Sequence, residues 1–173
     1  MNRFSTAKIC RAGVTASVYF ILTYFFQAIS FGPIQVRVAE ALTVLPLFFI
    51  ESVPALFIGC LISNFFSGFL LFDIAIGAPT TLLAAVFTYL VGKAVKNKHL
   101  RFVLGAIFPI VMNALAVPAV ILLSGGLEYT YAVQVVIIGL GQAAAVFLLG
   151  GLLYYSLYSL KESNPTAFVF KNK

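Results

Sequence analysis

Six long runs of apolar residues, separated by short polar or Gly- and Pro-containing turns, make up almost the whole chain. The runs are apolar on every face rather than along one stripe, which is typical of helices that lipid surrounds. They predict spans at about residues 9–29, 36–50, 54–72, 74–95, 102–123 and 131–157, followed by a short tail over 158–173. A transmembrane β-barrel is excluded, because its strands alternate polar and apolar positions.

The second run is short for a full crossing. About fifteen residues rise only about 22 Å as an α-helix, against a hydrocarbon core of about 30 Å. Gly32 and Pro33 precede this run and Pro54 follows it, so turn residues bound it on both sides. We therefore expect it either to tilt into the protein or to lie partly in the membrane interface.

Composition agrees with the pattern, since 62% of the 173 residues are hydrophobic and only 9% are charged. About 20 residues for each span, with short turns, leave no room for a soluble domain or an enzymatic head. The predicted fold is therefore an all-α integral membrane protein, a six-transmembrane-helix bundle forming a single domain over residues 1–173. The basic N-terminus and the first run also resemble a signal peptide, but they suit a first span better.

Positive charge gathers in three places along the chain. The basic clusters are Arg3, Lys8 and Arg11; Lys93, Lys96, Lys98 and Arg101; and Lys161, Lys171 and Lys173. With six spans all three clusters fall on one side of the membrane, and the connections on the other side carry no Lys or Arg. Because Lys and Arg concentrate in cytoplasmic loops, both termini are predicted to be cytoplasmic.

Several polar residues lie inside the apolar runs, most of them in the half opposite the basic clusters. Arg37 and Glu40 are three residues apart on one face of the second run, where they could pair or jointly bind a ligand. Asn64, Asp73, Asn113, Gln134 and Gln142 lie in or at the ends of later runs. Snorkelling of Arg37 to the headgroups and simple interhelical hydrogen bonds are the structural alternatives. Their grouping favours a binding cavity, whereas Glu128, in the last outer loop, suits a solvated charge.

The common catalytic and nucleotide-binding motifs are missing. The chain has no GxxxxGK(S/T), HExxH or GxSxG motif, one histidine in a basic loop, and Cys10 and Cys60 far apart. We therefore predict no ATP hydrolysis, no metal site and no cofactor. A membrane enzyme using Glu40, Glu51 or Asp73 is the alternative from another class, without a nucleophile–base pair to support it. Uphill transport would need a partner or an ion gradient.

Residues 31–43 (FGPIQVRVAEALT), 56–64 (LFIGCLISN) and Asp73-Ile74 resemble the QueT family, and MNAL at 112–115 and Gly141-Gln142 follow in the expected order. Members are substrate-binding S components of energy-coupling factor (ECF) transporters for queuosine precursors. The resemblance implies a six-helix bundle in the bacterial cell membrane, a transmembrane coupling protein and two cytoplasmic ATPases as partners. It also implies that Ala12 and Ala16, a small-xxx-small pair, dock on the coupling protein, although contact within the bundle explains the pair as well.

The implied ligand is a 7-deazaguanine such as prequeuosine 1, or queuine. Glu40 would accept the ring N–H and the exocyclic amine together, and Arg37 would hold Glu40 ionised. Asn64, Asn113 and Gln142 would bond the remaining ring edges, while an aminomethyl cation would need Asp73 or Glu128. The alternatives are an S component for another vitamin-like molecule and a self-contained small transporter, which would show a continuous polar lane through both leaflets.

Overall fold

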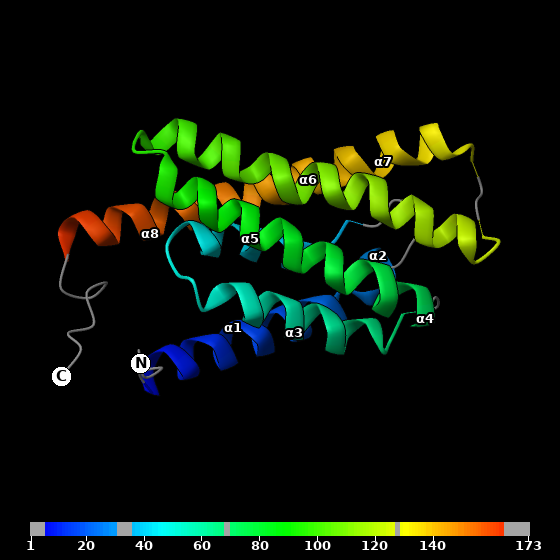
Figure 1. The fold of residues 1–173 in the computed structure, drawn as a ribbon, viewed down its shortest axis with the longest axis horizontal. Coiled ribbons are helices and arrows are strands. Elements are labelled where there is room, and N and C mark those ends of the chain that lie inside the picture. Colours follow the sequence, from blue (N-terminus) through cyan, green and yellow to red (C-terminus); the bar gives the residue numbers. More distant parts are fainter. Residues whose placement is uncertain (1–5, 31–35, 68–69, 127–128, 165–173) are drawn as a thin grey trace.

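The computed structural model describes residues 6–30, 36–67, 70–126 and 129–164, which form helices and, within those ranges, no strand (Figure 1). In chain order the elements are α1 (Thr6–Phe25), α2 (Gln27–Ser30), η1 (Val38–Leu47), α3 (Ser52–Asn64), α4 (Leu70–Phe72), η2 (Asp73–Gly77), α5 (Ala78–Ala94), α6 (Lys98–Leu123), α7 (Tyr131–Ala144), η3 (Ala145–Gly150) and α8 (Gly151–Ser163). η1 is a 3₁₀ helix, and η2 and η3 are π-helical turns within longer helices. The predicted all-α class is confirmed for this part of the chain.

Each of the six predicted runs contains helix, and the largest differences in boundaries are at the end of α3 and at the end of the last helix. α3 ends at Asn64 rather than near residue 72, and Leu70–Phe72 instead leads into η2 and α5. Side-chain bonding explains the early end, because the Asn64 amide donates to the backbone carbonyl of Asp73 and brings the next helix beside the end of α3. The last helix continues to Ser163, so the start of the predicted tail is helical.

Three helices are long and apolar enough to cross a membrane: Asp73–Ala94, Lys98–Leu123 and Tyr131–Ser163. Val38–Leu47 and Ser52–Asn64 are apolar but shorter. The outward-facing side chains suit lipid, since Leu71 is 76% exposed and Leu152 is 70% exposed, whereas Glu40 is fully buried. Large apolar side chains thus cover much of the outer surface, while most of the polar side chains within the helices are buried.

η1 lies at the centre of the bundle, where it contacts α1, α3, α5, α6, η3 and α8. Its ten residues extend about 20 Å, because a 3₁₀ helix rises about 2 Å per residue. The ten residues of η1 therefore span nearly the same length as the roughly 22 Å expected for fifteen residues of α-helix. Gly92 of α5 permits the close approach, since a Cβ there would lie 2.9 Å from the Leu47 backbone. The arrangement places Arg37 and Glu40 inside the protein.

Proline within α6 creates an acceptor that another helix uses. Pro109 has no N–H to donate to the carbonyl of Gly105, four residues earlier. The hydroxyl of Thr88, on α5, donates to that carbonyl at 3.0 Å, so the freed backbone group is satisfied without water. The α5–α6 contact is therefore specified by a polar bond as well as by apolar packing.

Three parts of the chain near the basic clusters meet at one end of the bundle, at the left of Figure 1: the start of α1, the α5–α6 connection and the end of α8. Arg11 of α1 pairs with Glu51, just before α3. At the same end, the hydroxyl of Tyr154 on α8 donates to the carbonyl of Lys98 at 3.0 Å. The grouping of these charges agrees with the pattern from which the orientation is predicted.

Candidate functional site

Glu40 is the centre of a buried polar cluster. It lies in the first turn of η1, is fully buried, and accepts hydrogen bonds from two other helices. The hydroxyl of Tyr19 on α1 donates to Oε1 at 2.8 Å, and the amide of Asn113 on α6 donates to Oε2 at 3.1 Å. An ionised carboxylate has about four lone-pair positions, so these bonds leave capacity for further N–H donors.

Arg37, at the N-terminal boundary of η1, has its charged partner on another helix. Its Nη2 atom lies 3.9 Å from Oδ1 of Asp73, and both side chains are about 4% exposed. Its Nε atom donates to the carbonyl of Ser30 at 3.4 Å. The ion pair joins η1 to the start of η2, so Arg37 is buried within the bundle rather than extended to the lipid headgroups.

Asn64 joins the end of α3 to the same group of residues. Its Nδ2 atom donates to the Asp73 carbonyl at 2.7 Å and lies 3.6 Å from Sγ of Cys60. Its Oδ1 atom is buried and has no hydrogen-bond partner among the described residues. A buried amide oxygen in that state can accept a hydrogen bond from a ligand or from water.

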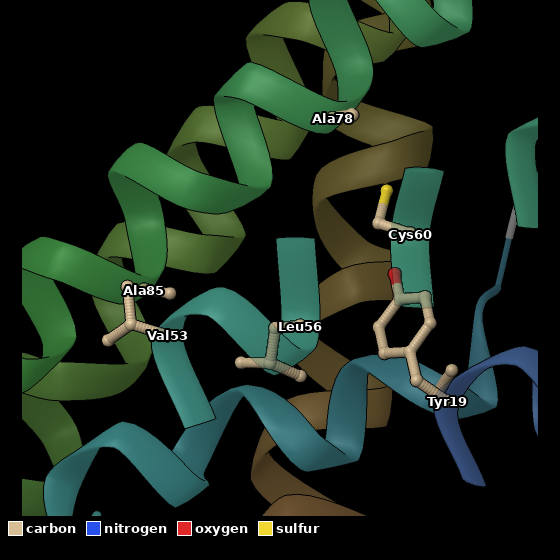
Figure 2. Close-up of a cluster of buried hydrophobic side chains, with 7 residues drawn as sticks. Tyr19, Val53, Leu56, Cys60, Ala78 and Ala85 are labelled. Atoms are coloured by element: carbon tan, nitrogen blue, oxygen red, sulfur yellow. The ribbon is translucent and has the colours of Figure 1, made fainter. Parts of the chain in front are cut away.

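The Tyr19 side chain also belongs to a cluster of buried, mostly apolar residues that includes Cys60. Figure 2 shows the Tyr19 hydroxyl pointing toward Cys60; Leu56 and Ala78 belong to the same cluster, and Val53 and Ala85 lie together at its far side. The hydroxyl of Thr81 donates to the Cys60 sulfur at 3.3 Å. Cys60 is thus a buried free thiol, and Cys10 is an exposed one.

Gln142 is buried on α7, with both Nε2 and Oε1 lacking a hydrogen-bond partner within the described part of the chain. Two helical turns later, Gly150 packs on η1, where a Cβ would lie 3.2 Å from the Ala41 carbonyl. Eight helical residues rise about 12 Å. Gln142 therefore lies about that far from Gly150 along the helix, toward the end of η1 that carries Arg37. Gln134, another of the polar residues within the apolar runs, is also buried on α7.

The structure brings most of the predicted site residues together and places others elsewhere. Arg37, Glu40, Asn64, Asp73 and Asn113 belong to the contacts just described. Gln142 is buried on a separate helix, and Glu128 lies outside the described residues. Sequence reasoning missed Tyr19, because a tyrosine within an apolar run has the same appearance as a packing or interfacial residue.

Ala12 and Ala16, the predicted docking pair, occupy different environments on α1. Ala12 is half-buried, whereas Ala16 is buried against α3, and a Cβ on Gly59 would lie 3.0 Å from its carbonyl oxygen. The close approach of the two backbones therefore accounts for the glycine at position 59, and Ala16 itself is buried within the bundle. Ala12 is the member of the pair with surface available to a second protein.

Chemically, the cluster suits recognition of a polar molecule. Within the described residues, no group of three His, Cys, Asp or Glu side chains is placed to hold a metal ion. Glu51, the other buried glutamate described, is paired with Arg11 near the basic end of the bundle. Open acceptors on Glu40 and Asn64 and the unpartnered Gln142 amide favour a ligand rich in N–H donors.

Comparison with known proteins gives a consistent result. The model of a family described as the QueT transporter matches residues 9–159. The queuosine precursor transporter QueT of Lactococcus lactis subsp. cremoris (strain MG1363) is 40% identical over 85 residues, which are 48% of this chain and 50% of that protein. The matching region thus spans about half the length of that relative. No solved structure matches the chain.

Proposed function

The chain belongs to the QueT transporter family, and from that premise we propose that it is the substrate-capture (S) component of an ECF-type importer. It is a multi-pass membrane protein, and its family and curated relative are transporters. The proposed ligand is a queuosine precursor, a 7-deazaguanine such as prequeuosine 1 or queuine. The relative's name indicates this class, and the cluster around Glu40 suits its chemistry.

The observation that carries the proposal is the buried Glu40 carboxylate, held by one donor on each oxygen. A 7-deazaguanine presents a ring N–H and an exocyclic amine side by side, and a carboxylate can accept from both. In a site without competing water, such a charge-assisted pair is stronger than two neutral hydrogen bonds. Glu40 therefore serves as the principal ligand-recognition group.

The remaining polar groups bind the other edges of the ligand. The open Oδ1 of Asn64 accepts from a ligand N–H, and Gln142 supplies both a donor and an acceptor. Asn113 acts through Glu40, to which its amide is already committed. A ligand with an aminomethyl cation also needs an anionic partner, and Asp73, paired at long range with Arg37, or Glu128 serves there.

Six membrane passes with both termini in the cytoplasm complete the proposal. The chain then supplies the ligand site but not the energy, which a transmembrane coupling protein and two cytoplasmic ATPases provide. The half-buried Ala12 and the neighbouring surface of α1 form the docking contact, because small side chains let a second helix approach closely. The protein is on this account a transport subunit rather than an enzyme.

Reconstitution tests the division of labour. Purified chain is inserted into lipid vesicles alone, or together with a coupling protein and two ATPases of the ECF type, and uptake of radiolabelled prequeuosine 1 is measured. Uptake only in the complete assembly with ATP supports the proposal. Uptake by the chain alone contradicts it and identifies a self-contained transporter. A matched assembly carrying ATPases inactivated in their phosphate loops controls for leakage.

A further inference from the structure

We infer that Tyr19 is a positioning residue that sets the plane of the Glu40 carboxylate and so makes the site selective for ligands with two adjacent N–H donors. This inference rests on the proposed function. Tyr19 is fully buried on α1, and its hydroxyl donates to Oε1 of Glu40 at 2.8 Å. The two residues come from different helices, so the bond fixes the carboxylate against the bundle rather than against its own helix.

The Tyr19 ring itself has little freedom to move. A Cβ on Gly59 of α3 would lie 2.9 Å from Cβ of Tyr19, so the two helices already meet at close contact there. The ring lies in the cluster with Leu56 and Cys60, with its hydroxyl directed inward (Figure 2). Thr23 donates to the Tyr19 carbonyl at 2.9 Å, one turn further along α1. The hydroxyl is therefore presented from a fixed position.

One hydrogen bond leaves the Glu40 carboxylate free to rotate, whereas two hydrogen bonds, one to each oxygen, fix its plane. The terminal torsion of a glutamate has a broad energy profile, so an unrestrained carboxylate rotates about its last bond. Tyr19 holds Oε1 and Asn113, on α6, holds Oε2, so the two oxygens are restrained from different sides of the site. The two oxygens are then held in one orientation, in which a bound ligand would meet them.

Fixing the plane of the Glu40 carboxylate affects ligands differently, according to how many adjacent N–H groups they carry. A molecule with two adjacent N–H groups uses both oxygens at once and requires them in its own plane. A molecule with a single N–H can follow a rotating carboxylate and loses little when the plane is free. Tyr19 therefore contributes mainly to the ratio of the two affinities, whereas a residue with a purely structural role would weaken both ligands alike.

The test compares 7-deazaguanine, which has the ring N–H and the adjacent amine, with 7-deazahypoxanthine, which lacks the amine. Affinities of the purified full chain are measured by calorimetry for the parent, for Tyr19→Phe and for Gly59→Ala, which pushes the tyrosine ring while keeping its hydroxyl. Loss of one hydrogen bond to a charged group corresponds to about 10- to 100-fold in affinity. We expect both variants to lower the affinity ratio by about tenfold or more, mainly through 7-deazaguanine.

Tyr154→Phe is the matched control, because Tyr154 is also fully buried and its hydroxyl donates to the Lys98 carbonyl at the basic end. It should lower thermal stability about as much as Tyr19→Phe and leave the affinity ratio unchanged. An unchanged ratio in folded Tyr19→Phe or Gly59→Ala, with 7-deazaguanine still bound by the parent, overturns the role of Tyr19 alone. Failure of the folded parent to bind 7-deazaguanine overturns the proposed ligand, and the inference with it.

Discussion

The Asn113 amide lies 3.1 Å from Oε2 of Glu40, although 73 residues separate the two in the sequence. This bond joins the central helix η1 to α6, and both residues are buried among helices whose outer surfaces are apolar. A polar bond at such depth is costly to leave incomplete, because no water can replace a missing partner. The bond therefore marks the depth in the bundle at which the buried polar side chains are grouped.

Replacing Glu40 by Gln should weaken binding of a 7-deazaguanine by about 10- to 100-fold, since a neutral amide offers one acceptor and no charge. Calorimetry on the purified variant measures the effect. Glu51→Gln is the control, because Glu51 is the other buried glutamate described and pairs with Arg11 near the opposite end of η1. Equal affinity of Glu40→Gln and the parent would show that the carboxylate has no role in recognition.

The Arg37–Asp73 pair should be coupled in stability. Removing one partner of a buried ion pair is destabilising, typically by about 3 kcal/mol. We expect Asp73→Asn and Arg37→Gln each to lower the thermal unfolding temperature in detergent, and the double variant to lose less than the sum of the two. Strictly additive losses would show that the 3.9 Å contact contributes no interaction energy.

Glycine packing around η1 predicts an order of stabilities. A Cβ at Gly92 would lie 2.9 Å from Cα and the carbonyl oxygen of Leu47, which are backbone atoms, whereas the three atoms nearest to one at Gly105 belong to the Leu47 side chain. Gly92→Ala should therefore cost about 1–3 kcal/mol, and Gly105→Ala less, because a leucine side chain can change rotamer.

Gly13→Ala is the control for this series, since nothing lies within 4 Å of a Cβ at that exposed helical position. It should stabilise the protein slightly, by up to about 1 kcal/mol, through helix propensity alone. Thermal unfolding of the three variants provides the comparison. The packing account is wrong if Gly92→Ala is as stable as Gly13→Ala.

The predicted topology can be read by cysteine labelling. In a background of Cys10→Ser and Cys60→Ser, the variant Asn97→Cys places a thiol in the α5–α6 connection, and Ser124→Cys places one at the end of α6. A membrane-impermeant maleimide applied to intact cells should label position 124 and leave position 97 unlabelled until the membrane is opened. The reverse pattern contradicts cytoplasmic termini, and labelling of both positions contradicts a crossing by α6.

The docking role proposed for α1 separates its two small residues. Ala12→Leu should reduce uptake by the complete assembly while leaving ligand binding and thermal stability near the parent values, because Ala12 retains exposed surface. Ala16→Leu should instead lower stability, since Ala16 is buried and the larger side chain has to be packed inside the bundle. Normal ATP-dependent uptake by Ala12→Leu would exclude this surface of α1 as the docking contact.

Much of the architecture follows from local pattern. Apolar runs and the turn residues between them predict the helices, because every span must bury its backbone hydrogen bonds internally. The early end of α3 could not be read in this way, since it depends on the Asn64 side chain reaching the Asp73 backbone. The 3₁₀ form of η1 likewise depends on the helices packed around it.

For the site, residue type was a better guide than spacing. Arg37, Glu40, Asn64, Asp73 and Asn113 attract notice because lipid disfavours their side chains, and the structure brings them together. Their partners were not predictable, because Arg37 pairs across helices with Asp73 and Glu40 bonds to Tyr19 and Asn113. Such contacts depend on helix rotation and depth, which a single sequence does not encode locally.

On the proposal made above, this chain binds a queuosine precursor without any partner protein. Calorimetric titration of the purified, detergent-solubilised protein with 7-aminomethyl-7-deazaguanine tests it most directly, with guanine and riboflavin as comparison ligands and thermal unfolding to verify the folded state. We expect saturable binding of the deazaguanine with near one-to-one stoichiometry and much weaker binding of riboflavin. Absence of binding by a folded sample, or equal binding of riboflavin, would contradict it.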